Sequence, residues 1–286
     1  SFTRCLRYAL QSFGVTQTPE ELRAQMLLPF APALMTNAVC FEQACLAAEP
    51  LQLAHVAEAC GVQAEYLALR PDAWANAFAR RYTRERMQHT LDDGGVIMAD
   101  GDWDIGGPMR AWGVLSDISG SVFSGAVDRV DATLPGNPQT LVLLTPTNCS
   151  LAPRALVRSV LRGAIMHIHG SAVAQQRSAV LRGTDAVEYL ALYAARTPWC
   201  AACGDASARC IGAVLSRWAA DAAVATSYLH NVRTDLSAER ARALDEVIAA
   251  YSSVQRELSA CAAGATKLVH TQNGAAQAAL GERVRA

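Results

Sequence analysis

The chain has 286 residues, a formal net charge of −1 and an isoelectric point near 6.6, so it lacks the basic excess that binds nucleic acid or an anionic membrane surface. Hydrophobic residues make up 51% of the chain and charged residues 18%, which excludes an intrinsically disordered protein and allows one large domain or two ordinary ones. The chain has no apolar run long enough to span a membrane, no signal-peptide pattern, and an odd number of cysteines, nine. We therefore expect a cytoplasmic protein with reduced thiols.

The chain opens with a pattern typical of a short buried helix. Thr3 is a good N-cap residue, and apolar residues repeat at helical spacing from Leu6 to Phe13 until Gly14 ends the run. Cys5 falls in the first turn, where the positive end of a helix lowers the pKa of a thiol. This is a position suited to a nucleophilic cysteine, but the position alone is more often that of a small, inert, buried hydrophobic residue; the order of elements described below shifts the interpretation toward a nucleophile.

The first 150 residues mix helices with strands, and the next part of the chain is rich in alanine. Further helices are expected from Thr18, over 32–48 and 51–60, and in pieces over 71–91. Strands are expected over 63–69, 94–100, 110–118, 121–130 and 140–146. Short turns such as Ser119-Gly120 join consecutive strands, which predicts an antiparallel sheet.

The second half is predicted to be helical throughout. Helices are expected over 153–166, 170–182, 184–196, 207–231, 237–262 and 273–284. This change of character predicts two domains, 1–150 and 151–286. The apolar helical half could also provide an interface between copies of the chain.

Three stretches carry a resemblance to a known superfamily. They are "CLRYALQSFG" from Cys5, "LAHVAEACGVQAEYL" over 53–67, and "LDDGGVIMADGDWD" over 91–104 followed by "AWGVLSDISGSVFSGAVD" over 111–128. They resemble the papain-fold cysteine acyltransferases and peptidases, most closely the butirosin-pathway acyltransferase family. The resemblance implies an α+β fold: a papain-like domain with an N-terminal cysteine helix and an antiparallel sheet in 1–150, then an all-α domain in 151–286 that covers the site.

The resemblance also implies a catalytic relay. Cys5 would be the nucleophile, a histidine would stand at the head of strand 110–118, and Asp128 would orient its imidazole. Ala111 occupies the expected histidine position. Two interpretations stay open: the natural protein has lost the base, or its histidine was deliberately changed to alanine to trap a complex. Asp128 is otherwise an ordinary strand-end or turn aspartate.

Three further residues are candidates for substrate binding. Trp112 and Trp103 would wall an acyl pocket or simply pack in the core. Asp104, with Asp102, lies on a glycine-rich segment over 99–110, and such loops often carry function.

The spacing of Cys200, Cys203 and Cys210 resembles part of a zinc site. A closed structural site needs a fourth ligand, which only a distant residue such as His167 or His169 could supply. The favoured interpretation is packed thiols, so no metal is predicted.

The resemblance implies a cysteine acyltransferase in specialised-metabolite biosynthesis. An acyl group would arrive as a thioester on the 4′-phosphopantetheine arm of a carrier protein, pass to Cys5, and leave by aminolysis or hydrolysis, with no bound cofactor. The first alternative is a cysteine peptidase or amidase acting on a peptide. The second is a non-catalytic pseudoenzyme that binds an acyl carrier partner. A weaker one is a helical partner-binding protein whose first half is a scaffold.

Overall fold

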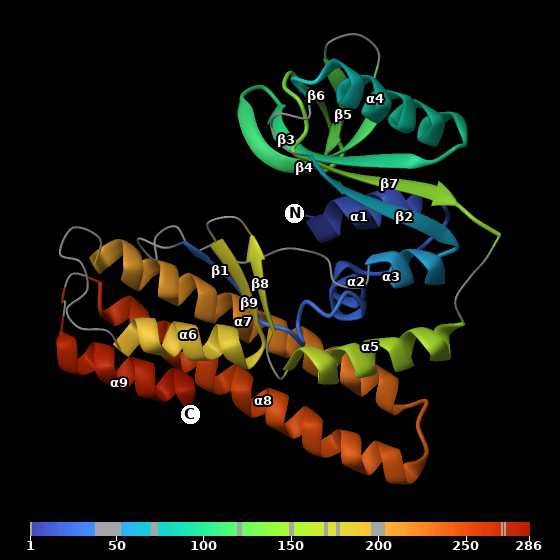
Figure 1. Ribbon diagram of the computed structural model, residues 1–286. Coiled ribbons are helices and arrows are strands. Elements are labelled where there is room, and N and C mark those ends of the chain that lie inside the picture. The colour runs from blue at the N-terminus through green and yellow to red at the C-terminus, as the bar shows by residue number, and fades with distance from the viewer. Residues whose placement is uncertain are drawn as a thin grey trace. The chain divides into compact units, whose positions relative to one another are not determined.

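The computed structural model describes residues 2–37, 53–69, 74–118, 122–148, 152–168, 171–175, 178–195, 204–269, 271 and 273–286. The chain divides into two compact units (Figure 1). Unit 1 comprises Ser1–Leu22 and Gln52–Leu156, and unit 2 comprises Arg23–Leu51 and Val157–Ala286. The division near residue 156 lies close to the predicted boundary at 150, whereas an early segment of the chain groups with unit 2.

Unit 1 is built on a six-stranded antiparallel sheet with helices on both faces. Its elements are α1 (Phe2–Gln11), the start of α2 (Pro19–Gln25), α3 (Leu53–Ala59), β2 (Val62–Ala68), α4 (Ala77–Asp92), β3 (Val96–Asp104), β4 (Pro108–Asp117), β5 (Phe123–Val127), β6 (Val130–Leu134), β7 (Thr140–Pro146) and the start of α5 (Pro153–Ile168). The strand order is β2-β7-β3-β4-β5-β6. The predicted antiparallel sheet is therefore confirmed.

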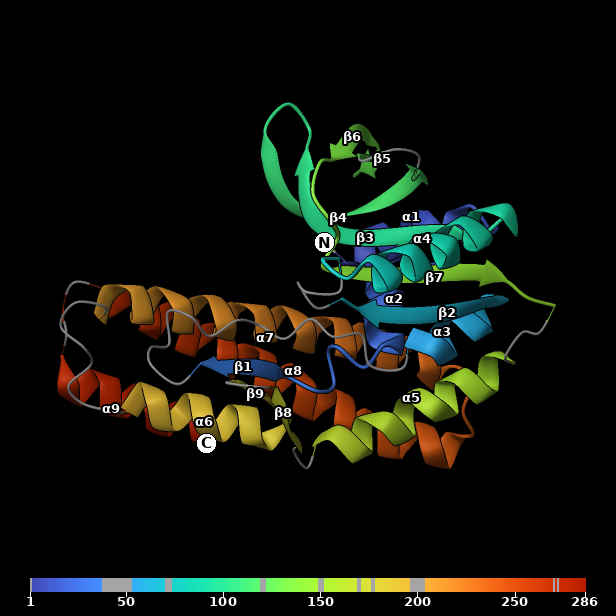
Figure 2. The ribbon, with the colours of Figure 1, turned by 45° about the horizontal axis from the view of Figure 1, so that its top comes forward.

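The sheet curls on itself at one end. Figure 2 shows β3 and β4 curving together toward β5 and β6, and Asp104 at the end of β3 pairs with Thr133 of β6. The predicted single strand over 121–130 is wrong, because the chain reverses at Asp128 and Arg129, which join β5 to β6. Both residues have positive φ, 48° and 71°, as a tight hairpin turn requires.

One face of the curled sheet encloses the core of unit 1. Trp103 is fully buried there, and Met87 of α4 packs in the same cluster. Close packing leaves no room for a larger side chain at Gly113, because an added Cβ would lie 2.5 Å from Cζ2 of Trp103. The interior of the curl is therefore filled by side chains.

Helix α1 ends as the sequence predicts but begins earlier. Gly14, with φ 79°, terminates it, and the Gly14 amide donates to the carbonyl of Gln11 at 3.0 Å. The helix begins at Phe2, so Thr3 lies inside its first turn and is not the N-cap.

Unit 2 combines a small antiparallel sheet with long helices. Its elements are β1 (Ala33–Asn37), β8 (Ser171–Gln175), β9 (Ser178–Arg182), α6 (Thr184–Ala195), α7 (Gly204–Arg233), α8 (Ala238–Lys267) and α9 (Gly274–Arg285). The strand order is β1-β9-β8. The all-α prediction for residues 151–286 is therefore wrong, because 171–175 and 178–182 form strands where a helix is predicted over 170–182. The helix predicted over 32–48 is wrong where the structure describes it, since 33–37 form β1, and its remainder from residue 38 lies outside the described residues. The pairing of β1 with β9 is a long-range contact that no local periodicity reports.

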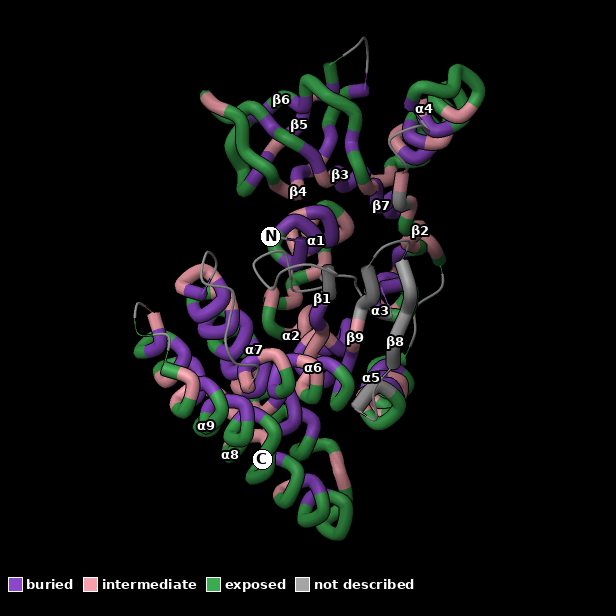
Figure 3. The backbone as a smooth tube through the Cα atoms, turned by 60° about the vertical axis from the view of Figure 1, so that its left-hand side comes forward, coloured by how far each residue is buried: buried purple, intermediate pink, exposed green. Residues whose placement is uncertain are grey.

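The helices of unit 2 enclose one apolar core (Figure 3). The long helices α7 and α8 pack along each other, and α9 packs on α6. Every described helix is too short or too polar to cross a lipid bilayer.

The segment that begins at Arg23, in the last turn of α2, is tied to the helices of unit 2. Arg23 forms an ion pair with the buried carboxylate of Asp221, to which Arg217 also contributes at 3.4 Å. Phe30 makes edge-on ring contacts with Tyr228 and Tyr251. These contacts account for the grouping of this segment with unit 2.

Candidate functional site

Cys5 lies on the buried side of α1, which packs on β3 and β4. The residue is 4% exposed. Burial raises the pKa of the Cys5 thiol to about 12, and the negative charge of Asp128 adds to this effect. The expectation of a lowered pKa at this position is therefore wrong, because the loss of solvent on burial has the largest effect on the thiol. The thiol is protonated at neutral pH.

Ala111 and Trp112 lie on opposite faces of the sheet. Ala111 pairs with Gly101 and packs against the enclosed core that contains Trp103. Trp112 turns to the other face, where its ring meets Phe2 of α1 edge-on at 5.0 Å. A histidine in place of Ala111 would point away from the helix that carries Cys5. On β4, Trp112 and not Ala111 lies on the face toward this helix, so the fold turns the predicted histidine position away from α1.

The described part of the chain places no imidazole beside Cys5. Its histidines with described side chains are His55 on α3, His89 on α4 and His230 on α7. None of them belongs to α1 or to the strands on which α1 packs. A Cys-His relay is therefore not assembled among the described residues.

Asp128 does lie beside α1, as the predicted relay requires, but in a turn and not on a strand. Its carboxylate stands 4.0 Å from the Arg4 guanidinium. The next residue, Arg129, places its guanidinium over the ring of Tyr8 at 4.8 Å and donates to Oε1 of Gln11 at 3.4 Å. The β5–β6 turn is thus held against α1 by both of its central side chains.

A cavity of about 200 Å³ lies between this turn and the first helices. It is lined by Arg4, Arg7, Tyr8, Pro19 and Asp128. The Nε of Arg7 is buried and meets no acceptor within the described ranges. Sequence reasoning missed this cluster, although Arg4, Arg7 and Tyr8 stand at the i, i+3, i+4 spacing that places side chains on one helical face.

In the structure, Trp103 packs in the core and Asp104 holds the shape of a hairpin. Trp103 is fully buried and fills the curled sheet, so it walls no open pocket. Asp104 accepts hydrogen bonds from the amides of Gly106 and Gly107 at 3.0 and 2.9 Å, which shapes the β3–β4 hairpin. Asp102 is exposed on β3.

Two of the three clustered cysteines, Cys200 and Cys203, lie outside the described residues, as does His169. Cys210 is half-buried on α7. Over the described ranges, no three histidine, cysteine, aspartate or glutamate side chains come together as a metal site would require. The absence of metal at the cysteine cluster stays a prediction.

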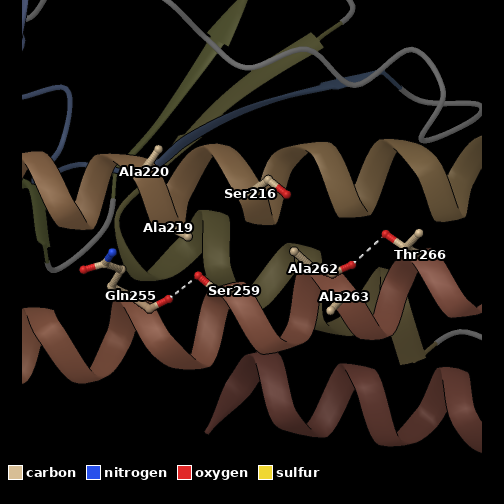
Figure 4. Close-up of a pocket in the computed structure, with 8 residues that line it drawn as sticks. All are labelled: Ser216, Ala219, Ala220, Gln255, Ser259, Ala262, Ala263 and Thr266. Carbon is tan, nitrogen blue, oxygen red and sulfur yellow. Dashed lines mark hydrogen bonds between the residues drawn. The ribbon is translucent and has the colours of Figure 1, made fainter.

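A second depression of about 400 Å³ runs between α7 and α8 in unit 2. Figure 4 shows that mostly small side chains line it and that the hydroxyls of Ser259 and Thr266 turn back to their own helix. Ser259 donates to the carbonyl of Gln255 at 2.8 Å, and Thr266 donates to that of Ala262 at 3.0 Å. These hydroxyls are already satisfied, so the groove offers few groups to a ligand.

No family model and no curated protein matches this chain.

Proposed function

We propose that this chain is a non-catalytic protein of papain-like architecture, a pseudoenzyme that binds an acyl carrier partner and leaves its acyl bond intact. The observation that carries this proposal is the surroundings of Cys5. The thiol is buried and protonated. On β4, the residue directed toward its helix is Trp112, and the ring of Trp112 packs edge-on against the ring of Phe2. Nucleophilic attack needs a thiolate, and within the described ranges neither a base paired with Cys5 nor a lowered pKa provides one.

The order of elements supports the papain-like part of the proposal. A buried cysteine helix precedes an antiparallel sheet, and it packs against β3 and β4, the second of which is the strand to which the resemblance assigns the histidine. The carrier part rests on the resemblance.

The test is intact-protein mass spectrometry after incubation with acetyl- and octanoyl-pantetheine thioesters. We expect no adduct on the native chain, and we expect Cys5→Ala to bind a phosphopantetheinylated carrier protein as tightly as the parent. Alkylation of Cys5 after unfolding in urea shows that the thiol is chemically intact. An acyl adduct that disappears in Cys5→Ala would overturn the proposal.

A second candidate is the cysteine acyltransferase itself, which one observation favours: Asp128 lies close enough to Cys5 to influence its ionisation. In that case the missing base belongs at 112. Trp112→His would then acquire acylation of Cys5 and Ala111→His would not. Acylation of neither variant, with both folded, would favour the pseudoenzyme.

A further inference from the structure

The cavity between α1 and the β5–β6 turn carries more positive than negative charge. Arg4 and Arg7 line it, Arg129 stands beside it on Tyr8, and Asp128 supplies the opposing carboxylate. The whole chain has a formal net charge of −1, so this concentration of arginine is local. Concave surfaces of one charge raise the local concentration of counter-ions.

The arginine side chains in this cavity keep hydrogen-bond donors that the described residues do not use. Arg7 has no hydrogen bond or ion pair with any residue that the structure describes, and its buried Nε lacks an acceptor. Arg4 has only the 4.0 Å approach to Asp128, which is long for a hydrogen bond. Because a buried donor without an acceptor is destabilising, a ligand oxygen that accepts from Arg7 would stabilise this site.

The backbone of the β5–β6 turn adopts a conformation that is unfavourable for residues other than glycine. Asp128 and Arg129 both adopt the left-handed conformation without being glycine, and such residues persist where the surrounding structure needs them. Here that conformation sets the Asp128 carboxylate at the cavity and the Arg129 guanidinium on Tyr8.

We propose that this cavity binds a hydrogen-phosphate group, with Arg4 and Arg7 donating to its oxygens and Asp128 accepting a hydrogen bond from its P–OH. Arginine forks match the geometry of phosphate oxygens. The volume, about 200 Å³, is below the roughly 300–1,000 Å³ of pockets for drug-sized ligands, so the site fits the phosphoryl group and not a whole nucleotide.

The Asp128 carboxylate makes the site selective. An ionised carboxylate can only accept hydrogen bonds, so it favours an anion that keeps a proton and disfavours sulfate, which has none at neutral pH. A phosphate monoester has lost its last proton above its second pKa of about 6, and a phosphodiester has none. At pH 7.5 inorganic phosphate still carries a proton, so we expect it to bind most tightly. Monoesters should bind less tightly, and a carrier-bound pantetheine diester should bind least.

The experiment is titration calorimetry of the full chain at pH 7.5 with inorganic phosphate, sulfate and glycerol 3-phosphate. We expect phosphate to bind at least tenfold more tightly than sulfate, with glycerol phosphate between them. Arg7→Gln should weaken phosphate binding at least tenfold. The matched control is Arg81→Gln, which removes an arginine paired with Glu85 on the exposed side of α4 and should change the affinity less than twofold.

Asp128→Asn supplies the second, independent readout. Its amide can donate to any anion, so we expect sulfate binding to strengthen and the preference for phosphate to fall at least tenfold. Equal binding of phosphate and sulfate by the parent, an equal loss in Arg7→Gln and Arg81→Gln, or no phosphate binding by the folded chain would each overturn the proposal. None of these results depends on acylation of Cys5, so failure here is distinguishable from failure of the pseudoenzyme proposal.

Discussion

The rate at which Cys5 reacts tests directly whether burial in the fold raises the pKa of its thiol. Burial moves the thiol pKa from 9.0 to about 12, so the thiolate fraction at pH 8 falls by roughly a thousandfold. Each remaining thiolate is intrinsically more nucleophilic, by about 15- to 30-fold for a Brønsted slope of 0.4–0.5. The net expectation is thiol–disulfide exchange slower than that of an unperturbed thiol by about 30- to 60-fold, before hindered access slows it further.

The assay is exchange with a small aromatic disulfide at pH 8, followed by peptide mass spectrometry of each cysteine. Cys5 in the same chain unfolded in urea is the reference. Cys60 is an internal control: its thiol is half-buried, and burial raises its pKa to about 11, so it should react faster than Cys5. Native Cys5 reacting within twofold of the unfolded reference would refute the reasoning.

The same burial makes stability depend on pH above neutrality. Between pH 9 and 12 the unfolded chain loses the Cys5 proton while the folded chain keeps it, so the free energy of unfolding falls as pH rises. This contribution is fully present below pH 9 and is lost at up to about 1.4 kcal/mol per pH unit above it. Denaturant titrations of the parent and Cys5→Ala across this window should diverge in slope, and parallel curves would contradict the burial of the thiol.

Two further substitutions test the packing of each unit by chemical denaturation. Gly113→Ala should destabilise unit 1 by about 1–3 kcal/mol, because the new methyl would meet Trp103 at 2.5 Å, whereas Gly107→Ala, with open space around it, should be near neutral; equal effects would contradict the filled interior. Asp221→Asn should destabilise unit 2 by about 3 kcal/mol, because it leaves the guanidinium of the buried pair uncompensated. Asp245→Asn, in an exposed pair that solvent screens, should change the stability much less than Asp221→Asn.

Much of the secondary structure could be read from local patterns. The Pro153 helix start and the capping residue Asn273 lie at the observed beginnings of α5 and α9, because proline and asparagine act within one helical turn. The alternating and apolar runs in 94–118 and 140–146 became strands of one antiparallel sheet for the same local reason.

The candidate site could be read only in part. The sequence led to Cys5 and Asp128, and the fold does bring them near each other. It could not show which neighbour on β4 faces α1, since alternation allows either register and only the pairing with β3 puts Trp112 on that face.

By itself, the sequence determined the beginnings of α5 and α9, the runs that form β2, β3, β4 and β7, and that a cysteine lies in the first helix, because these features follow from interactions within a few residues. Only the tertiary structure decided the strands β1, β8 and β9, the protonated state of Cys5, and the meeting of Arg4 and Arg7 with Asp128. These depend on burial and on contacts between residues far apart in the chain, and solvent exclusion and charge proximity exist only once those distant parts have packed.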